Sequence, residues 1–239
     1  MEPTAARAAV VQFPGTNCER ETVRALRAVE CPVDLIWHAD PFPQDVYSAV
    51  VLPGGFAHGD HLRAGAIARF APVMAGIERF AQAGGLVLGI CNGFQMLLEA
   101  GLLPGAMLRN ASLEFRSEWV YCRVESTDSP FLRGATQGLV LKLPIAHGEG
   151  NYVSVDDESN VALRYCDADG NVTPGANPNG AQANIAAIQN ERGNVFALMP
   201  HPERANDALL GSQDGRLIFE ALAAAVRQPA GASPALAWV

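Results

Sequence analysis

The sequence predicts a single α/β domain with an open, mostly parallel sheet, helices on both faces and antiparallel strands added to the same sheet. In the first half, short runs rich in valine, leucine and isoleucine alternate with helical patterns. Such apolar runs indicate strands buried on both faces, and their alternation with helices indicates parallel pairing. After residue 106 the strand-like runs follow one another with few helices between them, which predicts the antiparallel strands.

The first half is expected to contain four strands, over residues 8–13, 33–38, 49–55 and 86–90. Two helices are expected between these strands, over residues 21–30 and 67–85. Thr16 or Asn17 is a candidate cap for the first helix, because a short polar side chain accepts hydrogen bonds from the free N–H groups at a helix start.

The second half is expected to contain five strands, over residues 118–125, 139–147, 161–166, 185–190 and 195–201. A last helix is expected over residues 213–227, and it completes a domain of residues 1–227. Residues 228–239 are rich in alanine and proline and are expected to form a mobile tail.

The composition limits the classes of function. The 239 residues carry a formal net charge of -8, which argues against nucleic-acid binding because phosphate contacts need a basic surface. No apolar run approaches the roughly 20 residues of a membrane span, and the N-terminus does not resemble a signal peptide. The five cysteines are odd in number and lack CxxC spacing, so reduced thiols in a cytoplasmic protein are expected.

The stretch GICNG, residues 89–93, places a cysteine between two glycines where an expected strand ends and a helix begins. This G-x-C-x-G pattern is typical of a nucleophile elbow, a sharp turn that projects its central side chain above the carboxyl edge of the sheet. Cys91 would lie at that turn, where the positive end of the helix beginning near Asn92 favours a thiolate. Gln95, one helical turn later, would face the same pocket. A buried cysteine that merely ends a core strand is the alternative.

The stretch MPHPE, residues 199–203, supplies an imidazole and a carboxylate at the end of another expected strand. In extended chain His201 and Glu203 project to the same side, so the carboxylate can fix the orientation and the tautomer of the ring. A surface histidine in a proline turn is the alternative for this stretch alone. Together with Cys91, the pair predicts a Cys-His-Glu triad for nucleophilic catalysis.

The stretch VLPGGF, residues 51–56, delivers two glycines to the same edge of the sheet. Backbone N–H groups there, with that of Asn92, are candidates to bind the oxyanion of a tetrahedral intermediate. A plain glycine turn is the alternative. The nearby loop is rich in glycine and offers only one carboxylate, Asp60, beside His58 and His61. This is a weak set of metal ligands, so no metal site is expected.

The elbow and the HPE sequence together resemble the class I (triad) glutamine amidotransferases, which hydrolyse the side-chain amide of glutamine. The resemblance covers residues 8–222 and implies the fold of that family. Within the family, the chain is similar to the glutaminase subunits of phosphoribosylformylglycinamidine synthases, enzymes of purine biosynthesis. The stretches that carry this narrower resemblance are FPGTNCERET (13–22), GGFAHGDHLRAGAIA (54–68), PIAHGEGNY (144–152) and ANPNGAQANIAAIQNERGNV (176–195).

The resemblance implies a role for each candidate residue. Cys91 would be the nucleophile, His201 the base and then the acid, and Glu203 the residue that orients the ring. The oxyanion and the backbone groups of the substrate would be held at Gly54, Gly55, Phe56 and Asn92. Glutamine would be bound by Gln95 and by the loop His147, Gly148, Glu149 and Gly150, for which a strand-to-strand turn with a polar tip is the alternative.

One loop departs from the family pattern. Ala57, His58 and His61 stand where the family more often has serine-tyrosine and tyrosine, so the contacts of this loop with a partner stay open. The triad residues are unaffected by this difference.

The resemblance also implies partners. Ammonia released into water at neutral pH becomes ammonium, which cannot attack an electrophile. The ammonia therefore has to reach its acceptor without contact with bulk solvent. The chain has no G-x-x-x-x-G-K-[ST] phosphate loop, and no cofactor is expected in it. The resemblance implies a large synthetase subunit that uses ATP and magnesium to convert formylglycinamide ribonucleotide to formylglycinamidine ribonucleotide, often with a small third subunit.

Two other functions stay open from the sequence. An amidotransferase that serves a different acceptor would keep the triad and change the partner-facing loops. A cysteine hydrolase or a catalytically silent binding module on the same fold would not need a glutamine pocket.

Overall fold

The described residues form a mixed sheet of nine strands in a computed structural model that describes residues 6–155 and 160–227. The strand order is β2-β1-β3-β4-β11-β10-β9-β6-β7. Neighbouring strands are parallel from β2 to β11 and antiparallel from β11 to β7. The predicted fold class, an α/β parallel sheet with antiparallel additions, is therefore confirmed.

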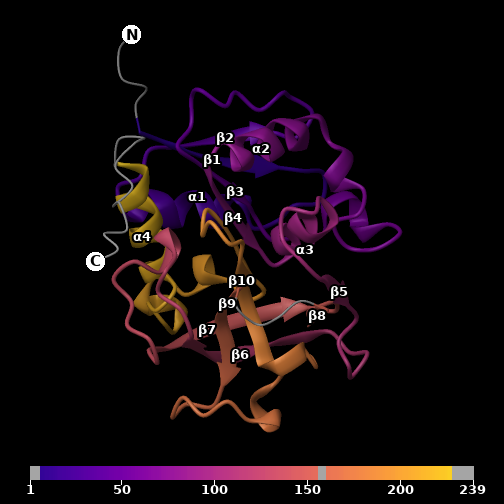
Figure 1. Ribbon diagram of the computed structural model, residues 1–239, viewed down its shortest axis with the longest axis vertical. Coiled ribbons are helices and arrows are strands. Elements are labelled where there is room, and N and C mark those ends of the chain that lie inside the picture. The colour runs from indigo at the N-terminus through magenta and orange to yellow at the C-terminus, as the bar shows by residue number, and fades with distance from the viewer. Residues whose placement is uncertain (1–5, 156–159, 228–239) are drawn as a thin grey trace, which may run out of the picture.

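The strands fall into three groups. The parallel strands are β1 (Ala8–Gln12), β2 (Val33–Trp37), β3 (Ala49–Leu52), β4 (Leu86–Ile90) and β11 (Val195–Leu198). The antiparallel strands are β6 (Arg116–Val124), β7 (Val140–His147), β9 (Val161–Cys166) and β10 (Ile185–Gln189). A separate ribbon, beside the third helix in Figure 1, consists of β5 (Ala106–Leu108) and β8 (Asn151–Val153).

The α-helices cover the parallel part of the sheet. They are α1 (Glu19–Ala28), α2 (Pro72–Gln82), α3 (Asn92–Glu99) and α4 (Arg216–Val226). The chain moves from β1 outward to β2, and from β3 in the other direction to β4, so right-handed crossovers put α1 and α2 on opposite faces. Figure 1 shows α4 packed beside α1, away from α2 and α3.

Some element boundaries differ from the sequence prediction. The second helix begins at Pro72 instead of residue 67, because proline favours the first helical position and the preceding Ala68–Phe70 forms a 3-10 turn. The predicted caps of α1 are wrong: Cys18 is the N-cap residue and makes no side-chain cap bond. The Thr16 hydroxyl instead accepts a hydrogen bond of 3.1 Å from the N–H of Phe13.

The interior of the sheet is apolar. Every residue of β3 and β11 is buried, as expected for strands covered on both faces. In β7, by contrast, buried and half-buried residues alternate. No helix in the described part of the chain is long and apolar enough to cross a membrane. The predicted tail, residues 228–239, lies outside the described residues.

Candidate active site

Three neighbouring parallel strands end at the same edge of the sheet and bring the predicted catalytic residues together. In the register of β4 and β11, Ile90 pairs with Leu198, and Leu52 of β3 pairs with Gly89. The elbow therefore follows β4 at the same level where the HPE stretch follows β11. The carboxyl edge of parallel strands is the usual place for the active site of an open α/β sheet.

The backbone at Cys91 is strained, as the elbow interpretation requires. Its φ of 48° and ψ of -102° lie in a region that residues with a side chain rarely adopt. The two glycines are needed because the helix lies very close to the strands: a Cβ on Gly93 would stand 1.9 Å from the carbonyl oxygen of Leu52. The N–H of Cys91 donates to the carbonyl of Leu198 at 2.8 Å, which ties the elbow to β11.

The imidazole of His201 is held by the carboxylate of Glu203. The distance between Nδ1 and Oε1 is 2.6 Å, and both residues are buried. With Nδ1 engaged in this way, Nε2 is the nitrogen left for the thiol of Cys91. Burial alone would lower the pKa of His201, but the charge of Glu203, followed by that of Cys91, raises the pKa well above its usual value. The site therefore favours a protonated His201 beside the sulfur of Cys91.

Cys18, a residue that the sequence did not single out, lies on the other side of the same imidazole. Its sulfur is 3.9 Å from Nδ1 of His201 and 3.1 Å from a guanidinium nitrogen of Arg204. Arg204 in turn forms an ion pair with Glu21 at 3.0 Å. Cys18 lies in the stretch FPGTNCERET, which carries the narrower family resemblance, but nothing in that stretch alone indicates a contact with His201.

Cys18, His201 and Glu203 also form a set of three possible metal ligands, with donor atoms within 4.8 Å of one another. Two observations weigh against a metal ion there. Nδ1 of His201 is already engaged by Glu203 at 2.6 Å. The guanidinium of Arg204 lies against the same sulfur, and a second cation would be repelled by it.

A cavity of about 150 Å³ opens at Cys91. Pockets for drug-sized ligands usually measure roughly 300–1,000 Å³, so this cavity suits only a small substrate. Its lining contains Gly55, Phe56, Asp60, Cys91, Gln95, Arg109, Phe115, Ala146, His147, Gly148 and Glu149. Of these, Asp60, Arg109, Phe115 and Ala146 were not predicted as binding residues.

Three predicted binding residues do not line the cavity. Gly54 packs against the ring of His201, and a Cβ added to this glycine would stand 2.7 Å from Cε1 of that ring. Gly150 packs against the ring of His147, and a Cβ added to it would stand only 2.2 Å from Cε1 of that ring. The Asn92 side chain braces the glycine loop, accepting a hydrogen bond from the N–H of Ala57 at 3.0 Å.

Gln95 lines the cavity, but its amide is engaged by the protein. Its Oε1 accepts from the amide of Asn92 at 2.9 Å, and its Nε2 donates to the carbonyl of Glu149 at 2.7 Å. The side chain thereby connects the helix α3 to the loop after β7. Phe56 is engaged at its backbone, where its N–H donates to the carbonyl of Gly15, and it meets the cavity with an exposed ring.

His147 is built into the wall as a neutral ring. Asn110 donates with its amide nitrogen to the carbonyls of Glu114 and His147, so its oxygen is the partner that accepts from Nδ1 of His147 at 3.1 Å. Nε2 then accepts from the amide of Asn179 at 3.4 Å. Burial, together with the charge of His201, lowers the pKa of His147 to about 4. Both ring nitrogens are therefore used to shape the wall.

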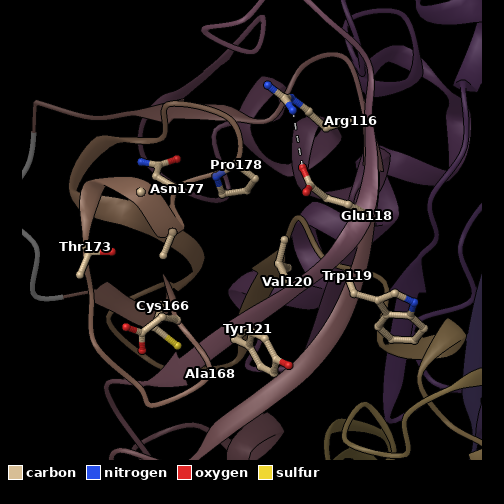
Figure 2. A pocket seen from close by; sticks show the side chains of 13 residues that line it. Arg116, Glu118, Trp119, Val120, Tyr121, Cys166, Ala168, Thr173, Asn177 and Pro178 are labelled. Atoms are coloured by element: carbon tan, nitrogen blue, oxygen red, sulfur yellow. Dashed lines mark ion pairs between the residues drawn. The ribbon is translucent and has the colours of Figure 1, made fainter.

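A larger cavity, of about 530 Å³, lies away from the triad, between β6 and the segment 166–178. Figure 2 shows its lining, with Arg116 and Glu118 paired at one end and Tyr121 near Cys166 at the other. Burial, in the main, raises the pKa of Cys166 to about 11. No histidine is among the described residues that line this cavity, so its thiol has no imidazole to act as a base.

Comparison with known proteins gives a consistent result. The family model of the CobB/CobQ-like glutamine amidotransferase domain matches residues 5–216. The phosphoribosylformylglycinamidine synthase subunit PurQ of Moorella thermoacetica is 52% identical over 221 residues, 89% of this chain and 93% of the relative. The subunit of the same name in Pseudothermotoga lettingae is 50% identical over 223 residues, 91% of this chain and 94% of the relative.

Solved structures agree with this likeness. A chain in the structure of PurLQS from Thermotoga maritima superimposes with a TM-score of 0.83 at 42% identity, covering 93% of this chain and 98% of that chain. A glutamine amidotransferase from Thermotoga maritima superimposes with a TM-score of 0.59 over 93% of this chain and 98% of its own. At 16% identity, the second likeness extends to the fold alone.

Proposed function

The chain belongs to the family of CobB/CobQ-like glutamine amidotransferases, and we propose that it is the glutamine-hydrolysing subunit of a phosphoribosylformylglycinamidine synthase. The names of its relatives and the structure of PurLQS support this assignment. The observation that carries the chemistry is the strained Cys91 beside the His201–Glu203 pair, at the mouth of a cavity for a small substrate.

In the first half-reaction, the thiolate of Cys91 attacks the side-chain amide carbon of glutamine and forms a tetrahedral intermediate. The first N–H groups of α3, which begins at Asn92 directly after Cys91, are suited to stabilise the oxyanion. His201 gives its Nε2 proton to the amide nitrogen, which leaves as ammonia when the C–N bond breaks. The product of this step is a thioester between Cys91 and the glutamyl group.

In the second half-reaction, the neutral His201 takes a proton from water as that water attacks the thioester. The C–S bond breaks, glutamate leaves and the thiolate and imidazolium are restored. Glu203 keeps Nδ1 protonated throughout, so that Nε2 alone exchanges protons with the substrate.

The ammonia is delivered to a large synthetase subunit, with a small third subunit in the assembly. The synthetase uses ATP and magnesium to activate formylglycinamide ribonucleotide, and ammonia then converts it to formylglycinamidine ribonucleotide. This chain itself takes part without a cofactor. The cytoplasm is the expected location, since purine precursors and reduced thiols are found there.

The test is a comparison of two nitrogen sources in the assembled complex. With glutamine, a complex that contains Cys91→Ala should form no formylglycinamidine ribonucleotide, whereas with added ammonia it should match the wild type. A glutamine analogue with a reactive group at the amide position should label Cys91 irreversibly. Glutamine-dependent synthesis by the Cys91→Ala complex, or labelling at another residue, would contradict the proposal.

A further inference from the structure

Two carboxylates face the cavity that opens at Cys91. Asp60 comes from the loop after β3, and Glu149 comes from the loop after β7, so the two lie far apart in sequence. Like charges repel, so each carboxylate raises the energy of the other when both are ionised. The protein thus places two like charges at one small cavity.

The loop that carries Asp60 is held in an unusual conformation. His58, Gly59 and Asp60 have φ values of 54°, 69° and 51°, three consecutive residues in the left-handed region. Such backbone strain persists only where surrounding contacts determine the conformation. One contact is the amide of Asn92, which donates to Oδ1 of Asp60 at 3.2 Å. The strain and the hydrogen bond together fix the carboxylate at the cavity.

Neither carboxylate is neutralised by the protein. Among residues 6–155 and 160–227, no lysine, arginine or histidine forms an ion pair with Asp60 or Glu149. The side-chain partner of Asp60 is the Asn92 amide, and Glu149 accepts from the N–H of Ala64 at 3.4 Å. Burial, and then the charge of Glu149, raises the pKa of Asp60 to about 6. A cationic group on the substrate would relieve both effects.

The ligand expected in this cavity carries such a group. Glutamine has an α-ammonium at the end opposite to its amide, separated from the amide carbon by two methylene groups and the α-carbon. Arg109 lines the same cavity and offers the opposite charge to the α-carboxylate. The charges of the lining therefore match a zwitterion whose amide lies at the sulfur of Cys91.

Resting on the proposed function, we infer that Asp60, assisted by Glu149, binds the α-ammonium of glutamine and is the residue that makes the site specific for an α-amino acid amide. Gln95 cannot take this part without breaking its bonds to Asn92 and to the Glu149 carbonyl. The ring of His147 is neutral and its two nitrogens are engaged. Asp60 is therefore the charged side chain best placed to recognise the amine.

The test compares glutamine with 4-carbamoylbutanoate, which has the same amide and carboxylate but no α-ammonium. Both are supplied to the complex containing wild-type chain or Asp60→Asn, and ammonia release is measured. We expect the substitution to lower kcat/KM for glutamine by about 10- to 100-fold, as for the loss of a charge-assisted hydrogen bond. For 4-carbamoylbutanoate, kcat/KM should change by less than about twofold, so the preference for glutamine collapses.

Asp45→Asn is the matched control, because it removes the same charge from an exposed residue that does not line the cavity. It should leave the kinetics of both substrates as in the wild type. Alkylation of Cys91 by iodoacetamide, which has no α-ammonium, should proceed at the wild-type rate in Asp60→Asn and so verify that the nucleophile is intact.

Two results would overturn the inference. An equal loss for both substrates would mean that Asp60 acts by holding Asn92 and the loop, and an unchanged preference for glutamine would place the ammonium elsewhere. Failure of the proposed function has a different signature: the wild-type complex would then release no ammonia from glutamine while still using added ammonia.

Discussion

In the described part of the chain, one cavity includes Cys91 and another includes Cys166, and they differ in where the sheet places them. The smaller cavity, about 150 Å³, lies at the carboxyl ends of parallel strands, where the elbow raises Cys91 above the sheet. The larger one, about 530 Å³, lies along the antiparallel strand β6, and Cys166 enters it from the end of β9 (Figure 2). Volume alone would favour the larger cavity as the active site.

The difference shows that a reactive cysteine in this fold depends on its position at the ends of parallel strands and not on the volume of the cavity beside it. Parallel neighbours β4 and β11 end together, so a residue from each can meet above the edge. The larger cavity instead lies between residues along β6 and the segment 166–178. Among the described residues that line this cavity Cys166 has no histidine beside it, and its surroundings raise its pKa to about 11, mainly through burial.

The largest effect is expected from removing each thiol in turn. Cys91→Ala should lower kcat for glutamine hydrolysis by at least about 10,000-fold, because loss of a nucleophile removes the covalent route. Cys166→Ala should leave kcat within about twofold of the wild type. Ammonia release by the assembled complex is the measurement. Comparable losses in the two variants would refute the distinction between the cavities.

Substitution of one carboxylate near each cavity tests whether only Glu203, which holds His201, is needed for activity. Glu203→Gln should lower kcat by roughly 100- to 10,000-fold, since an amide can hold His201 in the wrong tautomer. Glu118→Gln, in the larger cavity, removes only a half-exposed ion pair with Arg116 at 4.0 Å and should have no measurable effect. Steady-state kinetics of both variants decide the point. A fully active Glu203→Gln enzyme would mean that another group orients the ring.

A smaller effect is expected when a Cβ is added to Gly54, with Gly175 of the larger cavity as the matched control. The Cβ of Gly54→Ala would stand 2.7 Å from Cε1 of His201 and has to displace the ring. A displacement on the order of 1 Å can cost about 100-fold in rate, so kcat should fall by that factor while KM changes little. Gly175, in the larger cavity, has open space around the added Cβ, and Gly175→Ala should be silent. Equal kinetics in the two variants would show that the contact with the ring is unimportant.

Much of this architecture was predictable from the sequence. The valine- and leucine-rich runs predicted each strand of the main sheet, with errors confined to strand ends, such as the end of β11 at Leu198 instead of residue 201. The short strands β5 and β8 were missed, because three residues are too few to show a periodicity. Cys91 and His201 were predicted to converge because both follow apolar strands.

The residues that were missed lie in loops. Asp60 was considered only as a metal ligand, since nothing in the sequence indicates that three successive residues adopt positive φ and turn it toward the cavity. Cys18 reaches the ring of His201 through the start of α1, 183 residues away in the chain. Arg109 and Phe115 come from the irregular segment between β5 and β6. Contacts of this kind depend on tertiary packing and leave no local pattern.

The smallest effect concerns stability and depends on His147 in the wall of the smaller cavity. The pKa of His147 is about 4 in the folded protein and about 6.5 when unfolded, so between these pH values the unfolded state binds more protons. Stability should therefore fall as the pH drops from about 6.5 to about 4, by up to about 3 kcal/mol from this residue.

His147→Gln removes that contribution and isolates it from other titrating groups. The variant should be less stable than the wild type at pH 7, where the bonds to Asn110 and Asn179 are lost, and the difference should shrink toward pH 4. Urea unfolding of the isolated chain across this range is the measurement, with His61→Gln as the control, because that ring is exposed before and after unfolding. A difference independent of pH would mean that His147 binds its proton equally in the folded and unfolded states, and the neutral ring inferred from its two amide partners would be wrong.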